Sequence, residues 1–462
     1  MLRALEDHFP GTVETQPELI AHHCAQAGLY SKAIEYLGMA GQRAIERSSN
    51  PEAIGHLKRA LELLHSLPAD SEHAQVALKL EVLLAQAMIA SKGYSSPETM
   101  EVLLRAKKLI TEATETSQRF TILYGMWACY YVGGEVNKQH VTATEFLAEA
   151  QNHDDTAALC LAHRALGTTY LTMGEFSAAR KHLERAQGLY DPDQHLRYRF
   201  QYGQDIGTTV MCYLSWALWH LGFVDRASQL AREAVKRAEE ISHPHSLVYT
   251  LCHARGMMDV FRRESDDTKS YASVVTSLCS EHAFPFWAAG GQIFGSWAVI
   301  NHGEVDAGVD ELIRGLAAWR KTGARLWLPI FLALQAEGHF KAGRDQAALQ
   351  SIEQALATSD ETGERWAIAE ILRVKANLLL TTGHGRAEEV EGALIESLEI
   401  ARRQQAKSWE LRSATSVARL WRDQGKVQQA RELLAPVYGW FTEGFDTRDL
   451  KEAKVLLDAL VA

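Results

Sequence analysis

Apolar residues recur along most of this 462-residue chain at intervals of three and four positions, which is the spacing of one face of an α-helix. Segments that alternate apolar and polar residues are few, and runs typical of β-strands are almost absent. Ala, Leu, Glu, Arg and Gln dominate the periodic segments, and these residues favour helices. The pattern therefore predicts a chain that is helical almost throughout, with short turns between the helices.

Glycines mark these turns at a nearly constant interval. The marker glycines are Gly93, Gly134, Gly174, Gly222, Gly303, Gly343, Gly383 and Gly425. Most steps between them are 40–42 residues, one is 48, and the step of 81 after Gly222 is two steps with Arg263 at the missing turn. One pair of helices needs roughly 35–45 residues, so the interval predicts stacked helical hairpins.

The segment around Gly174 illustrates one repeat. Gly167 is small enough to let two helices approach closely, and Gly174 can take the left-handed conformation that ends the first helix. After the turn, Ala179 and Ala186 share one face of the second helix, and Leu183 packs between them. The same order of small and large residues recurs near both ends of the chain.

These residues resemble the tetratricopeptide repeat (TPR), in which a W-x2-L-G-x2-Y pattern precedes a glycine turn and an A-x3-F-x2-A pattern follows it. The TPR period is 34 residues, so a step of about 40 implies longer helices. Segments such as TGERWAIAEILRVKANLLL and LAPVYGWFTEGFDTRDLKEAKVLLDAL are similar to the C-terminal repeat region of multidomain bacterial signalling proteins. In those proteins a class III adenylate or guanylate cyclase domain, or a DNA-binding domain, precedes an AAA/STAND-type ATPase and then the repeats.

The resemblance covers essentially the whole chain and implies an all-α, right-handed superhelical solenoid of TPR-like antiparallel helix pairs. We expect N-terminal hairpins with a capping role over residues 1–92, a regular array over 93–440 and an amphipathic capping helix over 441–462. In the similar proteins the catalytic domains precede a segment like the start of this chain. We therefore expect either a fragment of such a protein or a gene that kept only the array, and we do not transfer cyclase or ATPase activity to it.

Charge and cysteine content narrow the class of protein. The net charge is −10, from 48 basic and 58 acidic residues, which does not favour direct binding to nucleic acid or to an anionic membrane. The sequence has no uninterrupted apolar run of membrane-spanning length and no signal peptide, so we expect a soluble, cytoplasmic protein. The six cysteines are scattered without a CxxC pair, which predicts buried free thiols in a reducing compartment.

Sequence motifs for catalysis are absent. The chain contains no GxxxxGK[ST] phosphate loop, no GxGxxG after a strand, no HExxH and no GxSxG. Its histidines and carboxylates do not fall at the spacing of metal ligands. We therefore expect no enzymatic activity, no cofactor and no metal site, and we look for function on the surfaces of the stacked helices.

In such a superhelix the first helix of each hairpin lines the concave side. The lining positions that the resemblance implies give an aromatic patch of Trp216, Trp219 and Trp297, a basic patch of Arg373, Arg412, Arg419 and Arg422, and two further candidate binding residues, Arg164 and Asn377. Trp and Arg are favoured anchors for protein partners. Two other interpretations stay open, since tryptophans at helical spacing also build cores and arginines on a helix also form solvated faces.

The resulting expectation is a non-catalytic scaffold or regulatory module of bacterial signal transduction. It would bind a protein or peptide segment, or a neighbouring ATPase or cyclase domain, on its concave face. A second hypothesis is a sensor of a small-molecule inducer, and a third is a cyclase fragment whose catalytic and ATPase domains are absent. A closed, aromatic-lined pocket would favour the sensor, whereas an open groove with charged walls would favour a peptide. The sequence identifies neither the partner nor the oligomeric state.

Overall fold

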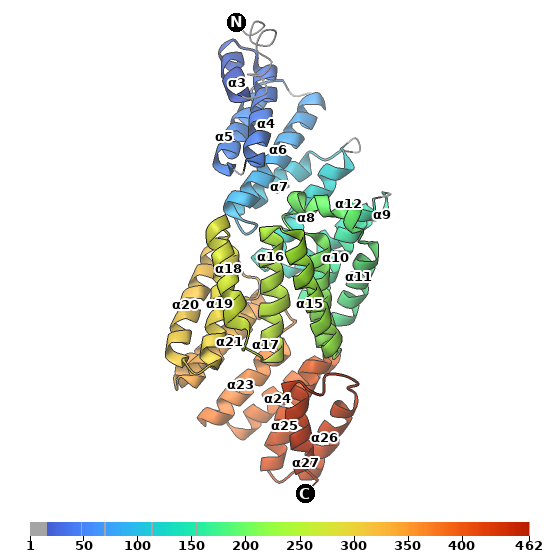
Figure 1. Ribbon diagram of the computed structural model, residues 1–462, viewed down its shortest axis with the longest axis vertical. Helices are drawn as coiled ribbons and strands as arrows, with labels where there is room; N and C mark the ends of the chain where they lie inside the picture. The colour runs from blue at the N-terminus through green and yellow to red at the C-terminus, as the bar shows by residue number, and fades with distance from the viewer. Residues whose placement is uncertain (1–15, 48, 69–70, 112–113, 154, 462) are drawn as a thin grey trace. The chain divides into compact units, whose positions relative to one another are not determined.

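The computed structural model describes residues 16–47, 49–68, 71–111, 114–153 and 155–461 (Figure 1). All regular structure in these residues is helical, and consecutive helices pack against each other in pairs. This confirms the predicted all-α superhelical solenoid. The chain forms two compact units, of which unit 1 ends at Gly133 and unit 2 begins at Gly134. The first boundary expected from the sequence, after residue 92, falls at the end of a helix inside unit 1.

Unit 1 is a stack of helices with a common apolar core. Its helices are α3 (Pro17–Gln26), α4 (Tyr30–Glu46), α5 (Asn50–His65), α6 (Ser71–Lys92), α7 (Pro97–Lys108) and α8 (Thr116–Gly133). Leu57, Leu84, Leu103 and Ile122 are buried where these helices face each other. A β-carbon at Gly41 would lie 2.6 Å from Leu57, so glycine at this position permits the close packing of α4 on α5.

One helix of unit 1 is apolar enough to be compared with a membrane span. The stretch His73–Lys92 of α6 is long enough to cross a membrane, and its mean hydropathy is 1.3. Core helices of soluble proteins meet the same criterion, and Leu78, Leu84 and Met88 of this stretch lie in the core of unit 1. A single helix of this kind is weak evidence for a membrane protein.

Unit 2 is also built of helical hairpins, with several short helical segments between residues 192 and 262. Its first helices are α9 (Val136–Gln151), α10 (Thr156–Thr172), α11 (Phe176–Leu189), α12 (Pro192–His195), the short 3₁₀ turn η1 (Leu196–Tyr198), α13 (Arg199–Tyr202), α14 (Ile206–His220), α15 (Val224–Ile241), α16 (Pro244–Thr250), the π-helical η2 (Leu251–Met257), α17 (Met258–Arg262) and α18 (Thr268–His282). They are followed by α19 (Pro285–Asn301), α20 (Val305–Lys321), α21 (Leu328–Lys341), α22 (Asp345–Thr362), α23 (Ile368–Thr382), α24 (Ala387–Arg403), α25 (Lys407–Asp423), α26 (Val427–Gly439) and α27 (Arg448–Ala459).

The turns confirm the ladder predicted from the sequence. All eight marker glycines have positive φ, from 69° at Gly134 to 97° at Gly303, which is the left-handed region that glycine enters most easily. Arg263, expected at the turn without a glycine, has a φ of 57°. Gly167 also behaves as predicted, because a β-carbon there would lie 2.7 Å from Leu183 of the paired helix. All six cysteines are buried free thiols, as expected.

Unit 2 closes on itself, because turns within its first hairpins lie against loops between its last hairpins. The early turns are Gly134, Gly174, Gly222 and Arg263, and the receiving loops are 322–327, 363–367, 404–406 and 440–447. Gly174 lies against Gln404, and Gly222 lies against Trp440, so contacting residues are roughly 185–230 positions apart in the sequence. Figure 1 shows the red C-terminal helices beside the ends of α15 and α17. We call this line of contact the closure seam.

Hydrogen bonds cross the closure seam. The backbone N–H of Arg365 donates to the carbonyl oxygen of Thr172 at 2.8 Å. The hydroxyl of Ser408 donates to the carbonyl oxygen of Trp219. All four groups belong to helix ends or loops, where backbone groups lack partners within a helix. The closure seam thus pairs the carbonyl oxygen of Thr172 with a backbone N–H of a receiving loop, and it adds a second donor to the carbonyl oxygen of Trp219, which also accepts from the backbone N–H of Gly222.

One helix begins with a cap supplied across the closure seam. The carboxylate of Glu443 accepts hydrogen bonds from the backbone N–H groups of Asp225 and Arg226 at 3.1 and 3.2 Å, at the start of α15. The residue that precedes this helix, Phe223, supplies no capping side chain. Unpaired N–H groups and the helix dipole favour a negative charge at this end, so a receiving loop completes α15.

Aromatic rings fill the inner side of unit 2. The aromatic interior consists of Trp216, Trp219, His220, His253, Phe261, Trp327, Trp366 and Trp409, all buried. The ring of Trp216 lies 5.4 Å from that of Trp327, and the ring of Trp219 lies 4.7 Å from that of Trp409. Rings carried by α14 therefore pack directly against rings carried by or next to the receiving loops, and this packing contributes to closure.

Candidate binding site at the closure seam

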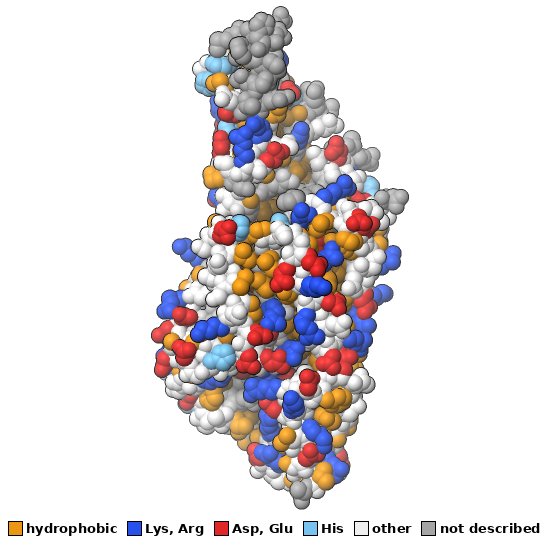
Figure 2. Space-filling view, in the orientation of Figure 1, with side chains coloured by type: hydrophobic (Ala, Val, Ile, Leu, Met, Phe, Trp, Pro, Cys, Tyr) orange, Lys and Arg blue, Asp and Glu red, His pale blue; other side chains and the backbone are white. Residues whose placement is uncertain are grey.

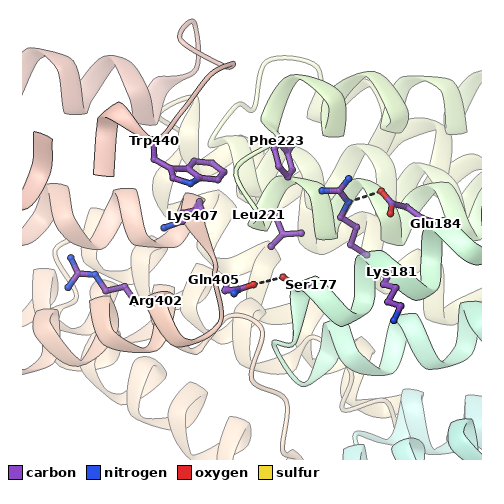
Figure 3. Close-up of a pocket in the computed structure, with 10 residues that line it drawn as sticks. Ser177, Lys181, Glu184, Leu221, Phe223, Arg402, Gln405, Lys407 and Trp440 are labelled. Carbon is purple, nitrogen blue, oxygen red and sulfur yellow. Dashed lines mark hydrogen bonds and ion pairs between the residues drawn. The ribbon is translucent and has the colours of Figure 1, made fainter. Parts of the chain in front are cut away.

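A pocket of about 720 Å³ opens to the surface at the closure seam, and we call it the seam pocket (Figure 3). Its early wall consists of Ser177, Arg180, Lys181, Glu184, Leu221 and Phe223, and its late wall consists of Arg402, Gln405, Lys407 and Trp440. The early wall comes from α11 and the turn between α14 and α15, and the late wall from the ends of α24 to α26. A hydrogen bond between the side chains of Ser177 and Gln405 joins the two walls.

Basic side chains dominate both walls of the seam pocket. On the early wall, Arg180 pairs with Glu184 at 2.7 Å, and Lys181 forms no ion pair with any residue that the structure describes. On the late wall, Arg402 and Lys407 share the buried carboxylate of Glu410, at 3.0 and 2.7 Å. Each wall therefore keeps one net positive charge after its internal pairing.

Two aromatic rings stand at the mouth of the seam pocket, one from each wall. The ring centroids of Phe223 and Trp440 are 6.0 Å apart, and Trp440 is 40% exposed. The guanidinium group of Arg180 lies 5.1 Å from the Phe223 ring, and the ammonium group of Lys407 lies 5.4 Å from the Trp440 ring. These contacts hold cations beside the exposed ring of Trp440 and the half-buried ring of Phe223, which Arg226 also contacts at 3.9 Å. The seam pocket thus offers positive charge and apolar contact within one cavity.

The tryptophans expected to line an open groove lie inside unit 2. Trp216 and Trp219 belong to the aromatic interior and are 0% and 2% exposed, and Trp297 of α19 is 6% exposed. The indole N–H of Trp216 donates to the carbonyl oxygen of His253 at 3.0 Å. Closure of the superhelix covers Trp216 and Trp219 with rings at the receiving loops. In this conformation these rings form a core rather than a free surface.

The predicted basic patch faces acidic residues of the chain itself. Arg373 and Arg412 are buried and both bind Glu370, at 2.7 and 3.0 Å. Burial raises the pKa of Glu370, but the two guanidinium groups outweigh it and lower this pKa to about 2. Arg412 also binds Asp449 of the C-terminal helix α27 at 2.8 Å.

The other two arginines of the patch are exposed and paired. Arg419 binds Glu452 of α27 at 3.1 Å, and Arg422 binds its neighbour Asp423 at 2.8 Å. The carboxylates that pair with this basic patch thus come in part from the chain's own last helix. Figure 2 shows basic and acidic side chains interspersed over this part of unit 2.

The two remaining candidates lie apart from the seam pocket. Arg164 of α10 is buried, donates a hydrogen bond to the Tyr249 hydroxyl at 3.0 Å and lies 5.5 Å from the Tyr213 ring. Asn377 of α23 is half-buried. Of the predicted site residues, Arg373, Arg412 and Arg419 line one small cavity together. The set as a whole does not meet in one place, and its role in binding stays a prediction.

The residues that do line the seam pocket were not among the candidates. Lys181 lies on the second helix of a hairpin, and Phe223 and Lys407 directly follow turns. None of them is one of the lining positions that the resemblance implies. A usable signal was the exposed aromatic Trp440 directly after Gly439, in a loop that the resemblance had already singled out. What no single repeat reveals is that this loop meets a turn 218 residues earlier in the sequence.

Comparison with known proteins supports the fold. No family model matches the chain. An uncharacterized protein of Rhizobium meliloti (strain 1021) is 24% identical over 406 residues, which are 87% of this chain and 39% of that protein. The chain thus spans about two fifths of the length of this relative.

Among solved structures, a Rap protein in complex with competence and sporulation factor is similar to 82% of this chain and 99% of that one, with a TM-score of 0.56 and 11% identity. The Cut9 and Hcn1 hetero-tetramer of the APC/C matches with a TM-score of 0.47 and 13% identity, over 88% of this chain and 83% of that one. The likeness to the Rap protein shows a TPR-like helical repeat fold for this chain.

Proposed function

We propose that this chain is a non-catalytic interaction and regulatory module that binds an acidic protein segment at the seam pocket. The observation that carries this proposal is the open pocket with net positive charge on both walls and two aromatic rings at its mouth. Carboxylates form strong, charge-assisted hydrogen bonds with guanidinium and ammonium groups. An acidic segment with an apolar side chain satisfies both features of the seam pocket.

A segment of a protein fits better than a compact ligand because the seam pocket is open and its basic groups are spread over two walls. Lys181 and Lys407 belong to opposite walls of the seam pocket, so a ligand that contacts both must span it. Arg and Trp side chains are also frequent anchors in protein interfaces. The charged, open lining corresponds to the alternative that favours a peptide.

The wider context follows from the resemblance and from the longer relative. We place the chain in the cytoplasm as a regulatory arm of a bacterial signalling protein. A cyclase or STAND-type ATPase domain, in the same polypeptide or in a separate one, is a source for the acidic segment. The Rhizobium protein is long enough to hold further domains, since this chain matches 39% of it.

A second candidate function is the sensing of a small anionic molecule. The volume of about 720 Å³ lies within the range of about 300–1,000 Å³ typical of small-molecule sites. A small aromatic carboxylate would place its ring beside Phe223 or Trp440 and its charge beside Lys181. This candidate replaces the first if such molecules bind and acidic peptides do not.

The test is a binding titration with the full chain. The probe is a fluorescently labelled peptide of Glu, Leu and Phe residues, and its control has Gln in place of every Glu. We expect the Glu peptide to bind and the Gln peptide to bind at least about tenfold more weakly, because charge-assisted pairs are lost. Lys181→Glu should weaken binding by roughly tenfold, whereas Lys321→Glu, an exposed lysine of α20 outside the seam pocket, should leave the Kd within about twofold.

Equal binding of the Glu and Gln peptides, or equal effects of the two lysine variants, would overturn the assignment of the seam pocket. The absence of binding to any acidic peptide, together with binding of a small aromatic carboxylate that Lys181→Glu weakens, would establish the second candidate instead.

A further inference from the structure

The seam pocket is divided between two parts of unit 2 that are distant in the sequence. Residues 177–223 form its early wall and residues 402–440 form its late wall. Each wall contributes one aromatic ring and one net positive charge. A ligand that contacts both walls therefore finds its complete site only when the closure seam is formed.

Electrostatics oppose closure at this point when the pocket is empty. Arg180 and Lys181 line one wall of the cavity and Arg402 and Lys407 line the other, and the direct wall-to-wall hydrogen bond is the neutral one between Ser177 and Gln405. Like charges in a partly enclosed space repel each other more strongly than they do in bulk water. A negatively charged segment placed between the walls converts this repulsion into two attractions.

Closure elsewhere along the seam rests on the packing of the aromatic interior and on close contacts at the turns. A β-carbon on Gly134 would lie 2.9 Å from the β-carbon of Arg325 and 2.9 Å from Thr362. Gln404 packs over Gly174 and donates to the carbonyl oxygen of Arg365 at 2.9 Å. These contacts lie outside the seam pocket, so the closure seam can be loosened without changing any residue that lines the site.

We propose that binding of the acidic segment and docking of the two walls are one equilibrium, so that the segment acts as a clamp on the superhelix of unit 2. This inference rests on the proposed function, because it assigns a regulatory consequence to the same site. The clamped state holds the early turns against the receiving loops, and loss of the segment releases them. A ligand shifts a conformational equilibrium only through its different affinity for the two states, and here the open state lacks one wall of the site.

The clamp makes a quantitative prediction about distant substitutions. If only the closed form binds, the apparent Kd rises in inverse proportion to the fraction of closed molecules. Gly134→Ala introduces a β-carbon that collides at the closure seam, away from the seam pocket. We expect it to raise the Kd of the Glu peptide at least about tenfold.

The matched control is Gly343→Ala. Gly343 has a φ of 71°, close to the 69° of Gly134, but none of the described residues lies within 4 Å of a β-carbon built on it. Both variants carry the same left-handed strain, and one of them disturbs the closure seam. Gly343→Ala should bind the Glu peptide within about twofold of the wild-type chain.

Opening itself is measured with spin labels on exposed positions of the two sides, Gln187→Cys on α11 and Glu399→Cys on α24. The six native cysteines are buried, so labelling is directed to the introduced ones. The labelled Gly134→Ala chain should show a longer and broader distance distribution than the labelled parent chain. The Glu peptide should shift that distribution back toward the parent distance.

The outcomes separate this inference from the proposed function. Peptide binding with equal Kd in the Gly134→Ala and Gly343→Ala chains, and with unchanged distances, would overturn the clamp and leave the binding function intact. No peptide binding by the wild-type chain would overturn both. If Gly134→Ala fails to fold, Gln404→Ala loosens the closure seam without a collision, and it should raise the Kd by about threefold or more.

Discussion

Two sets of turns in unit 2 share one sequence pattern and have opposite surroundings. Gly174 and Gly222 of the early turns are packed against later parts of the chain, within 2.1 Å of Gln404 and 2.5 Å of Trp440 for a built β-carbon. The late turns Gly303, Gly343, Gly383 and Gly425 have none of the described residues within 4 Å of such a β-carbon. All of them have positive φ.

The difference shows that local conformation and tertiary role are set by different information. A left-handed turn needs a glycine or a tolerant residue, and each repeat supplies it by itself. Whether the turn then meets another surface depends on how many hairpins complete one turn of the superhelix. The early turns are therefore buried at the closure seam by residues that no repeat-length window contains.

The largest expected effect comes from removing the charge that holds the end of the chain to the closure seam. Arg412 binds Glu370 and Asp449 and also donates to the carbonyl oxygen of Phe261 in α17. Arg412→Ala removes one of the two guanidinium groups that each of these carboxylates binds, since Glu370 keeps Arg373 and Asp449 keeps Arg263, and it should lower the free energy of unfolding by about 3 kcal/mol. Chemical denaturation monitored by circular dichroism measures this loss.

The matched comparison for Arg412→Ala is an exposed ion pair between two of the later hairpins of unit 2. Arg344 binds Asp306 of α20, and these side chains are 37% and 78% exposed. Arg344→Ala should cost at most about 1 kcal/mol, as is usual for exposed pairs. Similar losses for the two variants would mean that the closure seam carries no special share of stability.

The next effect concerns the pH dependence of the receiving loops. The carboxyl group of Glu364 accepts hydrogen bonds from the backbone N–H of Trp327 and the indole N–H of Trp366. Burial raises its pKa to about 7, although these hydrogen bonds act in the opposite direction. The unfolded chain loses this proton near pH 4.5, whereas the folded chain keeps it until about pH 7. The stabilisation from this group is therefore complete at low pH and is lost as the pH rises through 7.

Glu364→Gln removes the titrating carboxyl group, so a comparison of the two chains isolates its contribution to stability. The stability of the wild-type chain relative to the variant should fall by about 3 kcal/mol between pH 4 and pH 8, since one unit of pKa shift corresponds to about 1.4 kcal/mol. His220 and His253 act in the other direction in both chains, because burial lowers the pKa of each to about 3 and stability falls as the pH drops below 6.5. A stability difference that does not change with pH would show that Glu364 stays ionised.

The smallest expected effect is the direct comparison of two turns. Gly222→Ala places a β-carbon 2.5 Å from Trp440 and 2.9 Å from Lys407, whereas Gly303→Ala meets none of the described residues. The left-handed conformation costs both variants about 1 kcal/mol. Overpacking should add about 1–2 kcal/mol to the first. Thermal melting of both variants measures the difference, and equal melting temperatures would contradict the packing of Trp440 on the early turn.

The sequence was sufficient to predict the fold, because helical period and turn chemistry are local. The ladder of glycines was correct even at Arg263, where the period alone located a turn that has no glycine. Trp216 and Trp219, placed on the concave side by the resemblance, are buried in the aromatic interior. The sequence left open whether these rings line a binding surface or build a core, and the structure buries them.

Closure was not predictable in the same way, because it joins residues that are roughly 185–230 positions apart. The sequence does contain one signal that indicates closure. A tryptophan recurs at intervals of about 40 residues beside the receiving loops, at Trp327, Trp366 and Trp409. A basic residue lies one or two positions before each of them. Repeated large rings that all face inward require something to bury them. The seam pocket has no such repeated signal, since Lys181 and Lys407 become neighbours through closure alone.

The aromatic interior gives unit 2 an optical signal of its own conformation. Trp216 lies 5.4 Å from Trp327, and Trp219 lies 4.7 Å from Trp409, so each close indole pair joins α14 to a residue at or beside a receiving loop. Indoles at such separations share their excited states, which produces paired bands of opposite sign in circular dichroism. Separation of the two sides would abolish these bands while the helical signal remained. Unmodified protein therefore reports its own opening, without any attached dye.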